Sequence, residues 1–300
     1  MKDADSKTLK TFVSEIHAMK LHRSRTAGAA LKKPLLLLLV ISRVQKRPPP
    51  ENIFRFSDIR SDLDALIRNF GGRPTDSGAR PEQPFYHMGT SPFWTVHTTR
   101  TYTVRETATI TDLMDQRSYA RLAPPVFRLL STNAAARAHA ADAILQEWWP
   151  PTLHGDLIDE LGLSPSATSG CRHRNPEFVA RVLENFAYSC AFCGFHSVLN
   201  RHPTGIDAAH IHWHSQDGPD VVQNGIALCK LHHWAFDKGV LGLDHKQRVC
   251  VADALIVQAH GGLPIQALDG RRLAVKPSRA KLGDAFLTWH RKNVYLGVTR

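Results

Sequence analysis

Four residues in the second half of the chain have the types and spacing of a structural zinc site. Cys190 and Cys193 form one C-x2-C clip, and Cys229 and His232 form a second clip with the same spacing. Each clip presents two ligands from one tight turn, and together they predict a closed tetrahedral Cys3His site for structural Zn²⁺. The alternative is that Cys190 and Cys193 are buried thiols or a redox pair. The second clip favours zinc, because it supplies the other two ligands of a tetrahedral site.

A second set of residues, His210, Asn224 and His233, lies inside the loop that this zinc would close. One imidazole can act as a general base toward water, and another can bind a divalent cation that neutralises charge on a phosphate. The residue types therefore fit the hydrolysis of a phosphodiester. A single histidine of this set would indicate little, so the interpretation depends on the combined pattern.

The residues around this set resemble the HNH nuclease family over about residues 171–300. The matching segments are Ala209-His210-Ile211, Gly218-Pro219-Asp220, Asn224-Gly225-Ile226, Leu228-Cys229, His232-His233, Phe236-Asp237 and Trp289-His290-Arg291. The resemblance implies a ββα-metal fold with His210 as the general base and His233 as a ligand of a catalytic Mg²⁺ or Mn²⁺. It leaves Asn224 as either a ligand of that ion or a brace for the loop.

One position departs from the family pattern. Many HNH nucleases carry an aspartate immediately before the base histidine as a second metal ligand, and this chain has Ala209 there. Asp207 lies two residues earlier, on the same face of the expected strand. Asp207, Asp220, Asp237 or water is left to complete the shell of the ion. For Asp237, a helix-end cap or a buried hydrogen-bond partner is the stronger interpretation.

The first half of the chain carries a shorter pattern. It resembles the sulfur-binding domain of phosphorothioate-dependent type IV restriction endonucleases, which join that domain to an HNH module in the same order. The matching residues are Gly28, 32–38, Phe70-Gly71, 83–88 and 92–94, within about residues 10–150. Two positions depart from the family, because its usual histidine is Lys32 here and its usual aromatic residue is Gln83.

This second resemblance implies binding of double-stranded DNA in which sulfur replaces one phosphate oxygen. The predicted DNA-contact residues are Arg23, Arg25, Lys32, Lys33, Pro84, Phe85, Tyr86 and His87. The basic members would clamp phosphates. Pro84, Phe85 and His87 are the candidates for an apolar cup, in which a normal oxygen would lose its hydration without a partner. The alternative is that the aromatic residues at 84–86 and 93–94 belong to the core and turns of a plain domain.

The composition of the chain favours a polyanion as its partner. The formal net charge is +11, and residues 1–50 hold eleven lysines and arginines against three acidic residues. Double-stranded DNA fits such a charge. The apolar run 35–41 is much shorter than the ~20 residues that span a bilayer, so no membrane partner is expected. Three of the five cysteines are in metal spacing, which favours a reducing cytoplasm over a disulfide framework.

These patterns predict an α+β fold with two domains. The first is a mixed helix/strand DNA-recognition domain resembling the sulfur-binding domain, residues 1–150, followed by a linker, 151–170. The second is a ββα-metal HNH nuclease domain with a Cys3His zinc knuckle, residues 171–300. Periodicity and breakers predict helices at 9–22, 34–45, 58–70, 125–148, 176–187, 230–237 and 282–295, strands at 93–104, 206–211 and 225–228, a hairpin at 241–252 and a long loop at 73–92.

The combined prediction is a cytoplasmic restriction endonuclease that recognises phosphorothioated DNA and cuts it with an HNH site. Since a double-strand break needs two cuts, two copies acting as a homodimer are expected. One alternative is an HNH nuclease directed to methylated DNA, with Tyr86, Phe93 and Trp94 as an aromatic cage for a flipped base. Another is a non-catalytic zinc-containing DNA-binding protein, against which the intact His210, Asn224 and His233 argue.

Overall fold

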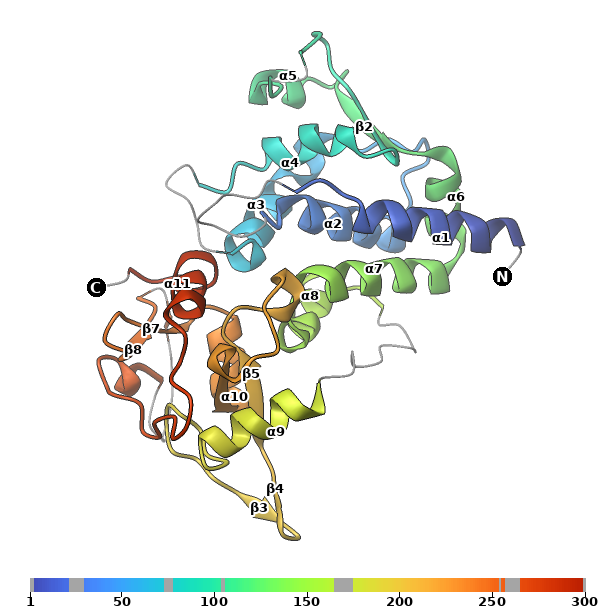
Figure 1. Ribbon diagram of the computed structural model, residues 1–300. Helices are drawn as coiled ribbons and strands as arrows, with labels where there is room; N and C mark the ends of the chain where they lie inside the picture. Colours follow the sequence, from blue (N-terminus) through green and yellow to red (C-terminus); the bar gives the residue numbers. More distant parts are fainter. Residues whose placement is uncertain are drawn as a thin grey trace. The chain divides into compact units, whose positions relative to one another are not determined.

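The computed structural model describes residues 3–21, 30–72, 78–103, 106–164, 175–253, 255–256 and 265–298, which divide into two compact units (Figure 1). The first unit contains the described residues up to 148 together with 154–164, and the second contains 149–153 and those from 175 onward. Helices are combined with antiparallel two-stranded sheets throughout the described chain. The predicted α+β class is therefore confirmed.

The core of the first unit is built around α2 (Lys32–Lys46), whose central residues 34–42 are all buried. Leu35, Leu36, Leu37 and Leu38 are completely buried, which explains why the apolar run is continuous rather than periodic. Helices α3 (Phe56–Phe70), α6 (Pro124–Thr132) and α7 (Ala134–Trp148) pack against α2, and α1 (Asp3–His17) packs against α6 and α7. Among the described residues, no helix is both long and apolar enough to cross a membrane.

A two-stranded ribbon and a short helix complete the first unit. Strand β1 (Trp94–His97) pairs antiparallel with β2 (Tyr119–Leu122), and α5 (Ile110–Met114) lies between them in the sequence. Helix α4 (Glu82–His87) and the 3-10 turn η1 (Met88–Thr90) precede β1. The indole Nε1 of Trp94 donates to the carbonyl oxygen of Phe85 at 3.2 Å. This bond ties α4 to the ribbon.

Four predictions for this unit were wrong in part. The helix predicted over 9–22 begins at Asp3 and ends at His17. The strand predicted over 93–104 ends at His97, because the Thr98 hydroxyl donates to the carbonyl of Arg100 and turns the chain. The loop predicted over 73–92 contains α4. The single helix predicted over 125–148 is broken at Asn133, which is extended and whose Oδ1 accepts a bond from the amide of Ala136. Asparagine competes in this way with the helical backbone.

The described residues between the two predicted domains form regular structure. Residues 151–153 form a 3-10 turn, η2 (Pro151–Leu153), and helix α8 (His154–Leu161) follows inside the range predicted as a linker. The hydroxyl of Ser42 on α2 donates to the carbonyl oxygen of Leu161 at 2.6 Å. Burial of Leu157 and Leu161 against the first unit gives this segment an apolar face, a signal that the glycines and prolines around it obscured.

The second unit contains the predicted ββα arrangement. Strand β5 (Ile206–His210) pairs antiparallel with β6 (Gly225–Cys229), which leads directly into α10 (Lys230–Asp237). Helix α9 (Pro176–Asn185) packs against both strands, and the side chain of Asn175 caps its first turn. His210 lies opposite Gly225, at the end of the hairpin where the loop 211–224 joins the two strands, so His210 and the residues of that loop lie close together.

The remaining elements of the second unit support this centre. A small hairpin of β3 (Val198–Leu199) and β4 (His202–Pro203), which the sequence did not predict, extends away from the unit (Figure 1). Strands β7 (Leu241–Leu243) and β8 (Val249–Val251) form the hairpin predicted at 241–252. Helix α11 (Asp284–Asn293) places the ring of His290 flat against Phe236 of α10, with centroids 3.7 Å apart. Three 3-10 turns, η3 (His214–Gln216), η4 (Val222–Asn224) and η5 (Ile265–Leu268), connect these elements.

Helix α9 approaches the β5–β6 hairpin closely at Gly225, where there is no side chain. A Cβ at this position would lie 2.1 Å from Cγ2 of Val182, so Gly225→Ala forces α9 away from β6. We expect this variant to lower the free energy of unfolding of the second unit by about 1–3 kcal/mol, measured by chemical unfolding and by hydrogen exchange of the β5 and β6 amides. Gly155→Ala, where no atom lies within 4 Å of the added Cβ, is the control. Equal stability of both variants would contradict this packing.

Candidate functional site

The two predicted zinc clips come together in the second unit. Sγ of Cys190 and Sγ of Cys229 each lie 3.3 Å from Nδ1 of His232. The ligand atoms of these three residues and Cys193 all lie within 4.8 Å of one another. Tetrahedral Zn²⁺, with bonds of about 2.3 Å to sulfur and about 2.0 Å to nitrogen, would separate a sulfur from a nitrogen by about 3.5 Å. The donor set and its spacing therefore fit zinc.

The knuckle is tied to the ββα elements by main-chain bonds. The amide of Gly194 donates to the carbonyl oxygen of Cys190 at 2.8 Å, which closes the first clip. The amide of Ala191 donates to the carbonyl oxygen of Ala227 on β6, also at 2.8 Å. A hydrogen bond from Cys229 lowers the pKa of Cys190, and the same bond raises the pKa of Cys229. Thiolate is the form that binds a metal, so this thiol is prepared for a cation.

Asn224 is completely buried, and its side chain holds the loop after β5. Its Nδ2 donates to the carbonyl oxygens of His212 and Pro219, both at 3.0 Å. Its Oδ1 accepts a bond from the amide of His212 at 2.8 Å. Because both ends of the amide are engaged with the backbone, this arrangement favours the bracing alternative over metal ligation.

His210 lies at the end of β5 in a defined orientation. Its Nε2 is 2.8 Å from Oδ1 of Asp220. Its ring stacks on Phe178 of α9, with centroids 4.2 Å apart, and lies 5.6 Å from the ring of His214. Burial lowers the pKa of His210, and the bond to Asp220 opposes that shift. A largely neutral imidazole at neutral pH is suited to accept a proton.

His233 lies on α10 between two carboxylates. Its Nδ1 is 3.0 Å from Oδ2 of Asp207, and its Nε2 is 3.2 Å from Oδ2 of Asp237. Lys230 also pairs with Asp207, at 2.7 Å. Burial opposes protonation of His233, but the charge of Asp237 and the bonds to both carboxylates raise its pKa to about 9. Hydrogen bonds from His233 and Lys230 outweigh burial and lower the pKa of Asp207.

Asp237 links the two histidines. Besides His233, it accepts a bond from Nε1 of Trp213 at 3.1 Å and one from the hydroxyl of Thr152. Its charge also raises the pKa of His210, so both imidazoles lie within electrostatic range of one carboxylate. The side chain of Asp237 is 2% exposed, which makes it a buried hydrogen-bond partner rather than an open metal ligand.

The donor pair Asp207 and His233 fits a hard divalent cation. Adjacent ligands of an octahedral Mg²⁺, each at about 2.1 Å, lie about 3 Å apart. Oδ2 of Asp207 and Nδ1 of His233 are separated by that distance, 3.0 Å. Asp237 on the other ring nitrogen would then orient the histidine, as carboxylates commonly do behind metal-binding histidines. Ala209 offers no ligand atom, so Asp207 is the carboxylate of β5 at this site.

In the first unit, Lys33, His87, Thr90 and Thr107 form what we call the Lys33 cluster. Nζ of Lys33 donates to Oγ1 of Thr90 at 3.1 Å and to the carbonyl oxygen of Lys20 at 3.0 Å. Nε2 of His87 lies 2.6 Å from Oγ1 of Thr107. Burial and the charge of Lys33 lower the pKa of His87. Sequence reasoning missed both threonines, because they lie far from the Lys-Pro-Leu run and have no motif of their own.

The other predicted DNA-contact residues fall into different environments. Lys32 is half-buried beside Glu82 and Arg80, and burial lowers its pKa. Tyr86 is half-buried and contacts the ring of Tyr102 edge to face, at 5.7 Å. Pro84 is buried. Arg23 and Arg25 lie outside the described residues.

Three aromatic residues of the predicted pattern belong to the core. Phe85 and Phe93 are completely buried and Trp94 is 1% exposed. Phe85 packs against Phe56 at 5.3 Å and Trp94 at 5.8 Å. These rings position α4 and β1, so they do not line an aromatic cage for a methylated base, and Phe85 does not present its ring at the surface.

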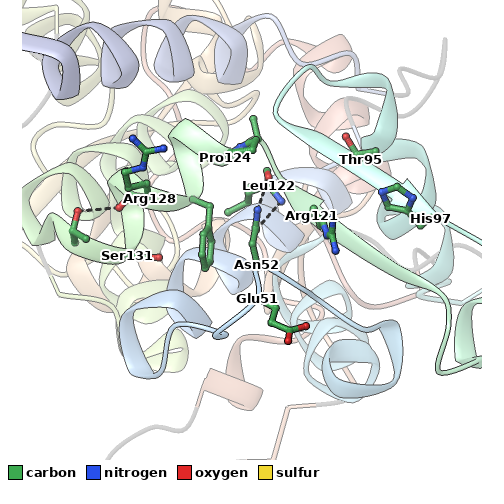
Figure 2. A pocket seen from close by; sticks show the side chains of 12 residues that line it. Glu51, Asn52, Thr95, His97, Arg121, Leu122, Pro124, Arg128 and Ser131 are labelled. Atoms are coloured by element: carbon green, nitrogen blue, oxygen red, sulfur yellow. Dashed lines mark hydrogen bonds between the residues drawn. The ribbon is translucent and has the colours of Figure 1, made fainter.

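The first unit also has an open pocket of about 640 Å³, which no motif indicated (Figure 2). Its lining includes His97 of β1, Arg121 of β2 and Arg128 of α6. Asn52 closes one side by exchanging two hydrogen bonds with the backbone of Leu122, at 2.7 and 3.1 Å. None of the described residues predicted to contact DNA lines this pocket.

Two family matches cover most of the described chain. Residues 9–166 match the ScoMcrA-like DNA sulfur-binding domain family, and this match spans more than half of the 300 residues. The chain belongs to that family. Residues 190–244 match the HNH endonuclease family. This ScoMcrA-like protein therefore joins a DNA sulfur-binding domain to an HNH endonuclease domain in the predicted order, and the predicted resemblance is confirmed.

Three solved structures are each similar to about half of the chain. The sulfur-binding domain of SprMcrA complexed with phosphorothioated DNA is 20% identical, over 53% of this chain and 96% of that one, with a TM-score of 0.45. The corresponding domain of ScoMcrA is 23% identical, over 51% and 95%, with a TM-score of 0.43. The type IV phosphorothioation-dependent restriction endonuclease ScoMcrA is 23% identical, over 51% and 28%, with a TM-score of 0.41. No curated protein matched the sequence significantly.

Proposed function

We propose that this chain is a modification-dependent restriction endonuclease that recognises phosphorothioated double-stranded DNA and hydrolyses it with its HNH domain. The observation that carries the proposal is the joining of a ScoMcrA-like sulfur-binding domain to an HNH domain in one chain. Recognition is assigned to residues 1–150 and cleavage to residues 171–300. A thiolate metal centre needs a reducing compartment, which favours the cytoplasm.

The first unit supports recognition through the Lys33 cluster. Replacing a phosphate oxygen by sulfur gives a larger and less strongly hydrated atom. Burial of this sulfur therefore costs less hydration free energy than burial of an oxygen. Lys33, Thr90 and Thr107 supply a cation and two hydroxyls for phosphate oxygens. The pKa of His87 is lowered, so its ring is neutral and offers a less polar neighbour for sulfur. In this proposal His87 contacts the sulfur, and Lys32 and Lys33 contact flanking phosphates.

The second unit supports hydrolysis by a water molecule that His210 deprotonates. Asp207 and His233 would hold a divalent cation, Mg²⁺ or Mn²⁺, and Cys190, Cys193, Cys229 and His232 would hold the structural zinc. When bound, the divalent cation neutralises charge on the phosphate and the leaving oxygen. Asn224 keeps the loop closed, so that His210 stays at the strand end.

Cleavage of matched plasmids tests this function directly. The full chain is incubated with Mn²⁺ and one plasmid prepared in three forms: phosphorothioated, methylated and unmodified. Cutting of the phosphorothioated form alone supports the proposal. Equal cutting of all forms, or cutting of the methylated form alone, excludes sulfur recognition. Binding of phosphorothioated DNA without any cutting would favour a non-catalytic DNA-binding protein instead.

A charge variant tests the role of the Lys33 cluster in phosphate binding. Lys33→Ala should weaken binding of phosphorothioated and unmodified DNA by similar factors, because a phosphate contact carries no information about the modification. The slope of log affinity against log salt should fall in magnitude by about one. Fluorescence anisotropy at several salt concentrations measures both quantities. Lys46→Ala, at the exposed far end of the same helix, is the matched control, and an equal effect of both variants would exclude this contact.

One HNH site cuts one DNA strand at a time, so a double-strand break requires two cuts, which two chains can make in succession or together. We therefore propose that the active form on DNA is a homodimer. Sedimentation of the chain with a phosphorothioated duplex should show two chains on each duplex, and a strictly one-to-one complex that still makes double-strand breaks would contradict it.

A further inference from the structure

The loop between β5 and β6 carries Asp220, a carboxylate whose role the motif leaves open. Asp220 lies ten residues beyond His210 in the sequence, and its Oδ1 is 2.8 Å from Nε2 of that histidine. A carboxylate accepts hydrogen bonds only, so Nε2 is the nitrogen that carries the proton. Within the part of the chain that the structure describes, Nδ1 of His210 has no hydrogen-bond partner.

The surrounding structure keeps this pair together. Asn224 donates to the carbonyl oxygen of Pro219, the residue immediately before Asp220, at 3.0 Å. Gly218 allows the loop to close, because a Cβ there would lie 1.9 Å from the carbonyl oxygen of His212. The loop backbone is thus fixed immediately before the carboxylate. The buried amide of Asn224 therefore acts on His210 through the placement of Asp220.

Aromatic packing fixes the plane of the histidine ring. Phe178 lies nearly parallel to the ring of His210, with an interplanar angle of 14° and centroids 4.2 Å apart. His214 is also nearly parallel, at 18° and 5.6 Å. The ring can turn within this plane only by breaking the bond to Asp220. One hydrogen bond therefore decides which nitrogen is available to water.

We propose that Asp220 is a positioning residue, which holds His210 in the tautomer with its proton on Nε2 and its lone pair on Nδ1. This inference rests on the proposed nuclease function. In the hydrolytic step, the water oxygen forms a bond to phosphorus and the bond from phosphorus to the 3′ oxygen breaks. The proton of the water moves to Nδ1, and the leaving oxygen takes a proton from solvent. The resulting imidazolium is stabilised by the carboxylate of Asp220.

Asp217, on the same loop, provides a matched control. It lies in the left-handed region, with φ of 68°, which asparagine tolerates. Asp220→Asn should lower kcat by roughly 100-fold, between the small effect of a surface charge and the roughly 10⁴-fold loss known for the orienting carboxylate of a catalytic triad. KM for DNA should stay unchanged. Asp217→Asn should leave both constants unchanged, and equal constants for the two variants would overturn the proposal.

The pH profile provides a readout that a purely structural role would not change. The groups that act on His210 are Asp220 and Asp237, which raise its pKa, and His214, which lowers it; Phe178 of α9 is uncharged. Removing the charge of Asp220 leaves the other groups in place. The acidic limb of kcat/KM should therefore move to lower pH in Asp220→Asn. An unchanged limb would overturn the proposal.

Nitrogen NMR tests the tautomer without any cleavage assay. The full chain is labelled with ¹⁵N-histidine, and His210→Gln identifies the signals of residue 210. At neutral pH we expect Nε2 to be protonated and Nδ1 to be unprotonated in the wild-type chain, with a mixture of tautomers in Asp220→Asn. A protonated Nδ1 in the wild type would overturn the proposal. If the wild-type chain cuts no DNA, the proposed function fails, while this spectrum still decides the role of Asp220.

Discussion

His210→Ala is expected to abolish cleavage of phosphorothioated DNA while leaving its binding intact. In the proposed mechanism this imidazole takes the proton of the attacking water, and general base catalysis typically contributes 10²–10⁴-fold to the rate. His210 packs against Phe178 at the end of β5, and the predicted DNA-contact residues belong to the other unit. The substitution therefore removes the base without removing the recognition surface.

The measurement is single-turnover cleavage together with an anisotropy assay of DNA binding. His202→Ala is the control, because this histidine lies on the exposed β3–β4 hairpin, outside the candidate site. We expect the control to cut at the wild-type rate. Cleavage by His210→Ala within threefold of the wild type would exclude His210 as the base. Loss of DNA binding in this variant would contradict the assignment of recognition to the first unit.

Loss of the zinc centre is expected to unfold the second unit. Structural zinc sites of this kind contribute apparent free energies of about 10–16 kcal/mol at neutral pH, more than the ~5–15 kcal/mol by which whole domains are usually stable. Cys229 connects β6 to α10, and Cys190 is tied to β6 through its neighbour Ala191. Cys229→Ala should therefore release both the knuckle and the helix that carries His233.

Metal analysis and limited proteolysis test this expectation on the full chain. The wild type should hold about one zinc per chain, and Cys229→Ala should hold none and be cleaved within residues 175–298. Cys250→Ala is the matched control, since this thiol is half-buried in β8 and is not one of the four clustered ligands. A metal-free Cys229→Ala chain that resists protease and unfolds like the wild type would show that the cluster is not a zinc anchor.

The local elements of the fold could be predicted from the sequence where the pattern was complete. Helix α10 was predicted at its observed bounds, and β5 and β6 were predicted to within one residue. Predictions were wrong where a side chain redirected the backbone. Asn133 broke the helix expected over 125–148, and Thr98 turned the strand expected to continue to residue 104. Such bonds are not visible in hydrophobic periodicity.

The aromatic residues of the first half illustrate the same difference. Phe85, Phe93 and Trp94 stood in a motif that suggested ligand contact, yet they are core residues. An aromatic residue on a short helix or strand buries its ring wherever the neighbouring elements leave room. That space depends on α2 and α3, which are distant in the sequence. The motif alone therefore could not distinguish a core residue from one that lines a sulfur-binding site.

Residues a few positions apart on one turn must lie close together, so spacing was enough to predict the two zinc clips and to place His233 on the helix beside them. Bonds between separate segments follow no such rule. The pairing of Asp207 with His233, of Asp220 with His210, and of Lys33 with Thr90 arises from how strands, loops and helices pack. The amino-acid sequence thus specified which chemical groups this protein carries. Tertiary packing specified which nitrogen of each imidazole faces which carboxylate.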